Sequence, residues 1–360
     1  MTTPLRIGIA GLGNVGASVF RLLRANSDIL SARTGRDIVV TAVSARDKTR
    51  NRGIDLANVA WHDDPRDLAN DPNVDLVVEL MGGAEGAAFD LVTGALKSGK
   101  DVVTANKALL ASRAGEILLH LNETSGCIAY EAAVAGGIPV IKSLREGLSA
   151  NRVQAIYGIL NGTCNFILST MTETGRDFDD VLLEAQQRGY AEADPSFDVD
   201  GVDAGHKLSI LSGLAFGCTP DVKNIDFKGI RGVSALDISF ARELGFRIKL
   251  LGIARKTARG IEQSVEPCLV PAANPIAAVG GPLNAVYVDG DFVGKVLLMG
   301  AGAGGDATAS AVVADIVDIA RGHKLPLMGA ANDRIGALQP ADIREREGSF
   351  YLRFKVLDVP

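Results

Sequence analysis

The chain contains 360 residues, 47% of them hydrophobic and 22% charged, and its formal net charge is −6. This is the composition of an ordinary globular protein, and the length allows about two or three structural units. The acidic balance argues against nucleic acid as a partner, and the lack of a long uncharged apolar run argues against a membrane span. No secretory segment precedes the first strand-like stretch, so we expect a cytoplasmic protein.

The first third of the chain alternates short apolar strands with amphipathic helices. Strands are predicted at residues 5–10, 38–44, 74–79, 100–104 and 127–131, with helices between them, notably at 87–98 and 109–124. This βαβ spacing predicts an α/β fold with a Rossmann-type doubly wound parallel sheet. We place the NAD(P)-binding domain at residues 1–138, and a helix at 307–321 is expected to return residues of about 303–325 to it.

The pattern changes after residue 138. Helices at 138–147, 165–174, 178–188 and 202–217, a strand at 152–159, and strands at 250–255, 261–269 and 285–288 predict an α+β domain with an antiparallel sheet. We assign residues 139–302 to this second domain.

A glycine loop follows the first predicted strand and opens a helix. Gly11-Leu12-Gly13-Asn14-Val15-Gly16 has the spacing at which glycines permit a tight turn, backbone approach to a pyrophosphate, and close helix packing. A turn that binds no ligand is the alternative. The context favours the six residues as a dinucleotide site, because the helix N-terminus also attracts phosphate charge.

The end of the second predicted strand indicates which dinucleotide binds. Ser44, Arg46 and Lys48 offer hydrogen bonds and positive charge to a 2′-phosphate, which favours NADP. A solvated charged loop is the competing interpretation, and Asp47 leaves NAD open.

Two later segments contain residues suited to catalysis. Lys107 comes just after a predicted strand, where doubly wound sheets place their ligands. Asp203 and Lys207 are four residues apart on one predicted helix face, a spacing that is also common in surface salt bridges. The carboxylates upstream predict an anionic pocket for an ammonium group, beside a lysine able to polarise a carbonyl; they are Glu192, Asp194, Asp198 and Asp200.

These segments resemble homoserine dehydrogenase from about residue 5 to 321. The resemblance rests on residues 78–83, 102–109, 131–134, 161–163 and, most specifically, 189–207. It implies reversible hydride transfer between NAD(P)H and L-aspartate 4-semialdehyde, giving L-homoserine, with residues 139–302 as the substrate-binding and dimerisation domain. It also implies that Lys207 acts at the substrate oxygen, that Asp203 positions it, and that Lys107 lies between substrate and nicotinamide.

The resemblance implies further contacts and partners. Substrate contacts are expected at Glu192, Asp198, Gly189, Tyr190 and Thr163, and cofactor contacts also at Thr104 and Gly305. The family binds a monovalent cation such as Na⁺ through backbone carbonyls, here matched by Glu131, Val134, Gly136 and Ile138. A glycine-rich turn before a helix explains the same residues equally well. A homodimer is implied by the resemblance only.

Two other functions compete with this interpretation. An aspartate-semialdehyde dehydrogenase would need a catalytic cysteine, and Cys164 lies near the expected site, but no histidine base accompanies it in that stretch. A non-catalytic NADP sensor would leave the lysine and carboxylate cluster without a purpose. We interpret three further residues as structural: His206, and Trp61 and His62 in a polar loop. The spacing of cysteines and histidines predicts no zinc site.

The final residues are expected to form a linker and an edge of another module. Residues 326–346 are rich in turn formers and charge, and residues 350–359 alternate like a strand. The latter resemble the opening strand of the ACT domain that gives many bacterial relatives threonine inhibition. We therefore expect residues 326–360 to lack a complete regulatory module, and the chain to be insensitive to threonine.

Overall fold

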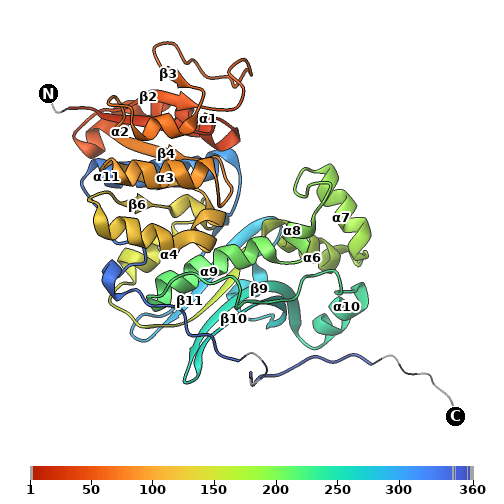
Figure 1. The fold of residues 1–360 in the computed structure, drawn as a ribbon. Helices are drawn as coiled ribbons and strands as arrows, with labels where there is room; N and C mark the ends of the chain where they lie inside the picture. Colours follow the sequence, from red (N-terminus) through yellow and green to blue (C-terminus); the bar gives the residue numbers. More distant parts are fainter. Residues whose placement is uncertain (1–2, 343, 345, 355, 357–360) are drawn as a thin grey trace.

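Two six-stranded sheets organise the chain into two units (Figure 1). The structure is a computed structural model, and it describes residues 3–342, 344, 346–354 and 356. No helix within the described residues is both long and apolar enough to cross a membrane.

The first sheet is parallel throughout, with strand order β3-β2-β1-β4-β5-β6. Its order reverses between β1 and β4, which is where doubly wound sheets bind ligands. The predicted α/β fold class is therefore confirmed. The strands are β1 (Leu5–Ala10), β2 (Ile38–Ser44), β3 (Ala60–His62), β4 (Leu76–Glu79), β5 (Asp101–Thr104) and β6 (Ile128–Ala129).

Helices cover both faces of this sheet because its central strands are buried on both sides. On one face, α1 packs beside α11, and Val19 and Ile316 join the same apolar cluster as Ile9. On the other face, Leu91 and Leu110 pack with Val77. The helices are α1 (Asn14–Ala25), α2 (Ser27–Thr34), α3 (Ala87–Lys97), α4 (Lys107–Glu123) and α11 (Gly305–Ala320).

The second sheet has the order β12-β11-β7-β9-β10-β8. The expectation of an antiparallel sheet was wrong at one edge, because the short strand β8 pairs parallel with β10. Helices α6 and α9 contact strands of this sheet from one side. The strands are β7 (Val153–Ile159), β8 (Asp226–Phe227), β9 (Phe246–Thr257), β10 (Gly260–Pro271), β11 (Leu283–Gly290) and β12 (Gly294–Ala301).

Shorter elements connect these strands. The predicted helix at 138–147 is a turn of α5 (Val140–Lys142) followed by a π-helical turn (Ser143–Gly147). The remaining helices of the second unit are α6 (Gly162–Thr174), α7 (Phe178–Gln187), α8 (Ser196–Val199), α9 (Val202–Phe216) and α10 (Ala235–Glu243). The 3₁₀ turns are Pro65–Ala69, Glu131–Ala133, Pro275–Ala278 and Asn332–Arg334.

Sequence patterns failed to indicate the helices α2, α8 and α10 and the strands β3, β8 and β12. Trp61 and His62 lie in β3 rather than in a polar loop, because Trp61 is opposite Val43 of β2. Strand β12 contains an apolar run at residues 296–299 that does not alternate, and pairing with β11 along its whole length holds it in place. Neither edge strand has the apolar alternation that sequence reasoning needs.

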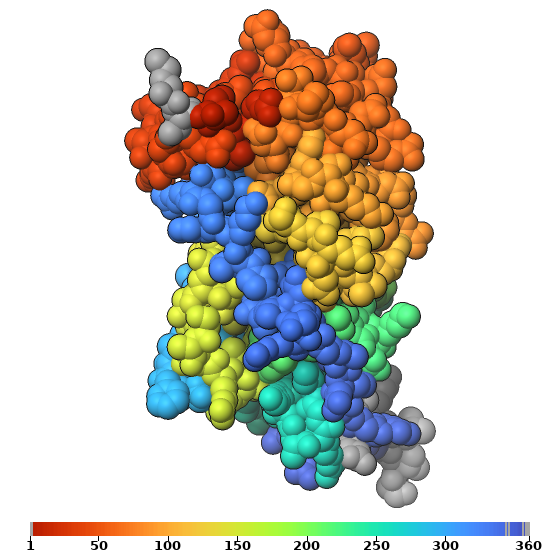
Figure 2. Space-filling model, turned by 60° about the vertical axis from the view of Figure 1, so that its left-hand side comes forward, coloured from red at the N-terminus to blue at the C-terminus, as the bar shows by residue number. Residues whose placement is uncertain are grey.

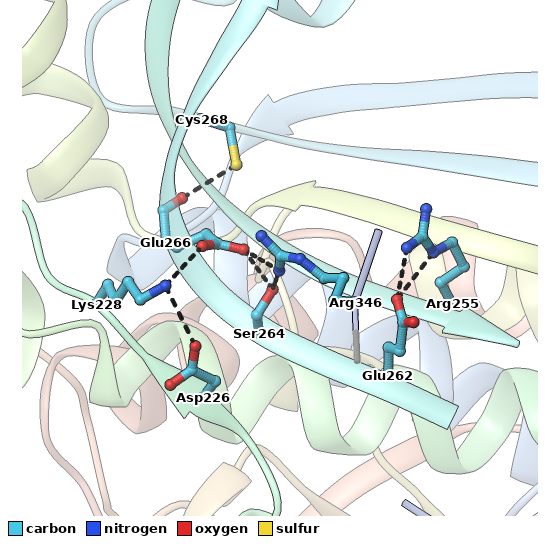
Figure 3. A network of polar contacts seen from close by, with 8 residues as sticks. All are labelled: Asp226, Lys228, Arg255, Glu262, Ser264, Glu266, Cys268 and Arg346. Carbon is cyan, nitrogen blue, oxygen red and sulfur yellow. Dashed lines mark hydrogen bonds and ion pairs between the residues drawn. The ribbon is translucent and has the colours of Figure 1, made fainter. Parts of the chain in front are cut away.

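The C-terminal segment crosses from the first unit over the second (Figure 2). Arg346 pairs with the buried Glu266, whose other oxygen lies 3.4 Å from the ammonium of Lys228 (Figure 3). The strand expected at 350–359 is absent from its described residues, 350–354 and 356, and the others lie outside the described residues. An isolated strand lacks a pairing partner, and here Phe350 and Phe354 are exposed.

Candidate functional site

A cavity of about 960 Å³ lies between the two units, at the carboxyl ends of β4 and β5. The first unit contributes the segments that follow these strands, and the second contributes the starts of α6, α8 and α9. Lining residues include Val15, Leu80–Gly82, Ala105–Lys107, Asn161–Thr163, Gly189–Glu192, Asp198, Asp203, Lys207, Asn284 and Ala301–Gly304.

Asp203 lies at the centre of the polar groups in this cavity. Its Oδ2 is 2.7 Å from Nζ of Lys207, and its Oδ1 is 3.0 Å from Nζ of Lys107. The structure thus brings together the three residues that the sequence suggested for catalysis, from two different units. Lys207 also donates to the carbonyl oxygen of Leu160 at 2.7 Å.

Close backbone packing positions helix α9, which carries Asp203 and Lys207. A methyl group on Gly205 would lie 2.3 Å from a ring atom of Phe227, and one on Gly201 would lie 2.9 Å from Val265. Gly201 also has a φ of 87°, a conformation that glycine adopts readily. The helix therefore lies close against β8 and β10, which fixes the direction of its first two turns.

Asn161 connects the carboxylates of this site. Residues 161–163 carried part of the family resemblance, but Asn161 itself was not predicted as a site residue. Its Nδ2 donates to Asp198 at 2.7 Å and to Asp203 at 2.9 Å, while its Oδ1 accepts from the backbone of Cys164. The last contact caps α6, and a capping asparagine was the only local signal. On the other unit, Asn106 caps α4 through Leu109 and so holds Lys107 at the first turn.

The environment separates the charge states of the two aspartates. Burial by itself would raise the pKa of Asp203, but the ammonium groups of Lys207 and Lys107 lower it well below the ordinary value. Burial raises the pKa of Asp198, and the hydrogen bond from Asn161 opposes this only in part. Asp203 is thus a permanent anion, whereas Asp198 takes up a proton more readily than an exposed aspartate.

We predict that kcat/KM for the amino-acid substrate falls as the pH decreases into the acid range. The raised pKa of Asp198 means that its carboxylate becomes neutral at a higher pH than usual, and a neutral acid no longer attracts an ammonium group. A pH profile of Asp198→Asn should lack this acid limb. Asp226→Asn, on β8 away from the cavity lining, is the control that should keep it, and an unchanged limb in Asp198→Asn would contradict the assignment.

The other expected substrate residues border the same cavity. Thr163 donates to the carbonyl of Tyr190 at 2.7 Å, and the Tyr190 ring packs 4.9 Å from that of Phe166, which joins the 189–192 segment to α6. Gly189 has a φ of 74° and turns the chain after α7. Glu192 is exposed on this segment and adds charge at the cavity wall.

The glycine loop has the geometry of a dinucleotide cradle. Gly11 has a φ of 98°, and a methyl group on Gly16 would lie 2.0 Å from the Gly11 carbonyl oxygen, so neither position accepts a side chain. Gly13 has open space where its side chain would be. A second cavity of about 430 Å³ opens beside this loop at the start of α1, lined by Leu12, Gly13, Asn14, Ala17, Ser18, Arg21, Arg50, Asn51, Arg52, Gly305 and Asp306.

Several expected cofactor residues lie away from these cavities. Ser44 is buried, and its carbonyl accepts from Gly11. Thr104 is buried and donates to Glu79 at 2.7 Å. Arg46 is exposed outside both cavities, and Lys48 lies over the Trp61 ring. The positive charge beside the glycine loop comes instead from Arg21, Arg50 and Arg52.

The residues expected to bind a cation form a buried turn. The Glu131 carboxylate accepts from the backbone N–H groups of Ile141 and Lys142, and burial raises its pKa to about 7. Gly136 leaves no room for a side chain beside Thr308 and Gly302. Ala135, directly before Gly136, has a φ of 52°, a left-handed conformation that costs a non-glycine residue energy. Val134 and Ile138 complete this turn and are buried. Among the described residues, no three acidic, histidine or cysteine side chains are placed to hold a metal ion together.

Cys164 and His206 have no feature of a catalytic pair. Burial raises the pKa of the Cys164 thiol well above its ordinary value, so the nucleophilic thiolate is disfavoured. His206 packs edge-on against Phe197 at 5.6 Å, and burial lowers its pKa, with the charge of Lys107 acting in the same direction.

Comparisons with known proteins agree with this site. Residues 139–317 match the homoserine dehydrogenase family, and residues 11–131 match its NAD-binding domain. The homoserine dehydrogenases of Neisseria gonorrhoeae and Pseudomonas aeruginosa are each 47% identical over 363 residues, covering 99% of this chain and 83% of the relative.

Solved structures lead to the same family. The crystal structure of a homoserine dehydrogenase from Thiobacillus denitrificans has a TM-score of 0.89 and 46% identity, covering 94% of this chain and 79% of that one. A hyperthermophilic archaeal homoserine dehydrogenase in complex with NADPH has a TM-score of 0.74 and 28% identity, covering 88% and 97%. The alternatives of an aspartate-semialdehyde dehydrogenase or a non-catalytic sensor are not favoured. With its dinucleotide-binding unit and a matching second unit, this chain belongs to the homoserine dehydrogenase family of oxidoreductases.

Proposed function

We propose that this chain catalyses the reversible, nicotinamide-dependent reduction of L-aspartate 4-semialdehyde to L-homoserine. The observation that carries the proposal is the contact of one aspartate with two lysines, in a cavity that the glycine-loop unit and the second unit share. A bound nicotinamide supplies or accepts the hydride. The chain's own residues then need only bind the amino acid, hold its oxygen and move one proton.

Lys207 is suited to the proton step. An ammonium group has three N–H donors, and Asp203 and the Leu160 carbonyl engage two of them. The third is left for the substrate oxygen, to polarise the aldehyde and protonate the new alkoxide as the hydride arrives at carbon. In the oxidation direction, the neutral amine accepts the hydroxyl proton.

The remaining groups orient the substrate. Asp203 compensates the positive charges of Lys107 and Lys207, so that both can lie near one substrate without repelling each other. Asp198 and Glu192 provide the negative charge that attracts an α-ammonium group.

The proposal is tested by following NAD(P)H absorbance during homoserine oxidation, with NAD and NADP in parallel. Absence of homoserine-dependent reduction with either cofactor would refute it.

We also propose that NADP is the preferred cofactor. Arg21, Arg50 and Arg52 line the cavity at the glycine loop, and no acidic residue other than Asp306 does so. Arg52 is held in place by its hydrogen bond to the Leu12 carbonyl at 3.0 Å and by the Trp61 ring. Guanidinium groups bind phosphate well, which gives the 2′-phosphate a site that NAD cannot use. The bound NADPH of the archaeal neighbour agrees with this preference.

The arginines give this preference a direct test. We predict that Arg50→Ala lowers kcat/KM for NADP by about tenfold, the loss of one charge-assisted contact, and changes that for NAD little. Arg46→Ala, which lies outside the cavity, should leave the NADP to NAD ratio unchanged. Equal losses for both cofactors in Arg50→Ala would contradict a 2′-phosphate contact. Initial-rate kinetics with both cofactors measure the ratio.

A monovalent cation at the turn of residues 131–138 is a further part of the proposal. The Glu131 carboxylate is occupied by two backbone N–H groups, so ligation there would use carbonyl oxygens. The left-handed Ala135 and the close packing of Gly136 hold the turn in a defined shape, which supports a built site over a loose glycine-rich connection.

We propose a homodimer through the open face of the second sheet. One face of this sheet carries four partly buried apolar and aromatic side chains that lie opposite one another on adjacent strands: Leu297, Tyr287, Tyr157 and Ile253.

We predict that Tyr287→Asp raises the dimer dissociation constant at least tenfold, because a charge enters an apolar contact. Phe292→Asp, on an exposed hairpin tip, is the control. Light scattering over a dilution series measures the mass, and unchanged dimers in Tyr287→Asp would exclude this face.

A further inference from the structure

Asn284 is on β11, beneath the proposed catalytic groups. Its side chain is hydrogen-bonded to the same peptide group that accepts a hydrogen bond from Lys207. It is only 1% exposed, and its Nδ2 donates to the Leu160 carbonyl at 3.1 Å. The same carbonyl oxygen accepts from Nζ of Lys207 at 2.7 Å. One backbone oxygen therefore connects a buried amide to the proposed proton donor.

The position of Leu160 explains why a side chain is needed here. Strand β7 ends at Ile159, which is opposite Ala285 of β11, so Leu160 and Asn284 are one step beyond the last paired residues. The Asn284 amide continues the pairing between β7 and β11 by one hydrogen bond. Because Asn161 comes next, this bond also anchors the residue that joins Asp198 to Asp203.

Packing holds the Asn284 amide in one orientation. A methyl group on Gly302 would lie 2.0 Å from the Asn284 Cγ, so this glycine is in contact with the amide. Turning the amide over would place its oxygen against the Leu160 oxygen, which is repulsive. The Oδ1 atom is buried without a hydrogen-bond partner among the described residues, although Asn284 lines the cavity.

We propose that Asn284 is a positioning residue for Lys207, acting through the carbonyl of Leu160. The inference rests on the proposed role of Lys207 in proton transfer. Without the amide donor, the Leu160 peptide is free to rotate, and Lys207 loses a fixed acceptor on the side away from the substrate. A displacement of the order of 1 Å in a catalytic group lowers turnover by up to about 100-fold.

Three variants test this role. In Asn284→Ala we expect kcat for homoserine oxidation to fall at least about tenfold, with KM for NADP within about twofold of wild type. Asn284→Asp is expected to depend on pH, because a neutral carboxylic acid has an O–H that can donate to Leu160, whereas the ionised form cannot. Its kcat relative to wild type should be highest near pH 5.5 and fall toward pH 8.5.

Gln263→Ala is a matched control for the loss of a buried amide. Gln263 is 2% exposed, and its Nε2 donates to the Asp221 carbonyl at 3.2 Å. Like that of Asn284, its side-chain oxygen has no hydrogen-bond partner among the described residues. It does not line the cavity. We expect its thermal midpoint to fall as in Asn284→Ala while kcat stays near wild type.

The outcomes are separable. A kcat within twofold of wild type in Asn284→Ala, an equal loss in Gln263→Ala, or a pH-independent Asn284→Asp would each overturn the positioning role. If Asn284→Ala does not fold, the pH series of Asn284→Asp still decides. A Lys207→Met variant run alongside tests the premise. Full activity there refutes the role of Lys207 and with it the positioning role, whereas a large loss there with wild-type kcat in Asn284→Ala refutes the positioning role alone.

Discussion

Lys207→Met is expected to lower kcat for homoserine oxidation by about 10²–10⁴-fold, the range for loss of a general acid or base. Methionine keeps most of the apolar stem but has no proton to give or take. Binding of NADP should be nearly unchanged, because the glycine loop lies on the other unit. Steady-state kinetics and a fluorescence titration of NADPH measure the two effects.

The variant should remain folded, since Asp203 keeps its contact with Lys107 and its hydrogen bond from Asn161. Lys228→Met is the matched control: this lysine also pairs with a buried acid, Glu266, but lies outside the cavity lining. Turnover near the wild-type rate in Lys207→Met would remove this residue from the chemistry. An equal loss in both variants would indicate a general effect of unpaired buried acids.

Asn161→Ala has the second largest expected effect. We expect kcat/KM for homoserine to fall about 100-fold, because the two nearby carboxylates lose the donor that lies between them, and the free energy of unfolding to fall by about 1–3 kcal/mol. The pKa of Asp198 should rise further, since the hydrogen bond from Asn161 is the largest of the interactions that oppose the effect of burial. The acid limb of the pH profile should therefore move to higher pH.

Part of the stability loss comes from the helix cap, and a second capping residue isolates it. Asn274 accepts from the backbone of Ile276 at 3.2 Å in the same way but lies outside the cavity. Asn274→Ala should lose about 1 kcal/mol with an unchanged pH profile. If Asn161→Ala changes stability but not the acid limb, the link between Asn161 and Asp198 is wrong. Denaturant titrations and pH profiles of both variants supply the data.

Local patterns were sufficient for much of the fold. Strands β1 and β2 begin and end where their apolar runs do, and α9 follows from the apolar run that begins after Gly201. Regular elements of this kind are dictated by residues close in sequence. Edge strands β3 and β12 and the mixed pairing of β8 were not predictable, because their order comes from a neighbouring strand far along the chain.

The candidate site divides in the same way. The glycine loop and the helical spacing of Asp203 and Lys207 were predictable, since both depend on nearest neighbours along the chain. Only the tertiary structure placed Lys107 from the other unit 3.0 Å from Asp203, put Asn161 between two carboxylates, and brought Asn284 to the Leu160 carbonyl 124 residues away. It also showed that Arg50 and Arg52, rather than Ser44 and Arg46, line the cavity beside the glycine loop. Such contacts depend on how two units pack together, which no local pattern records.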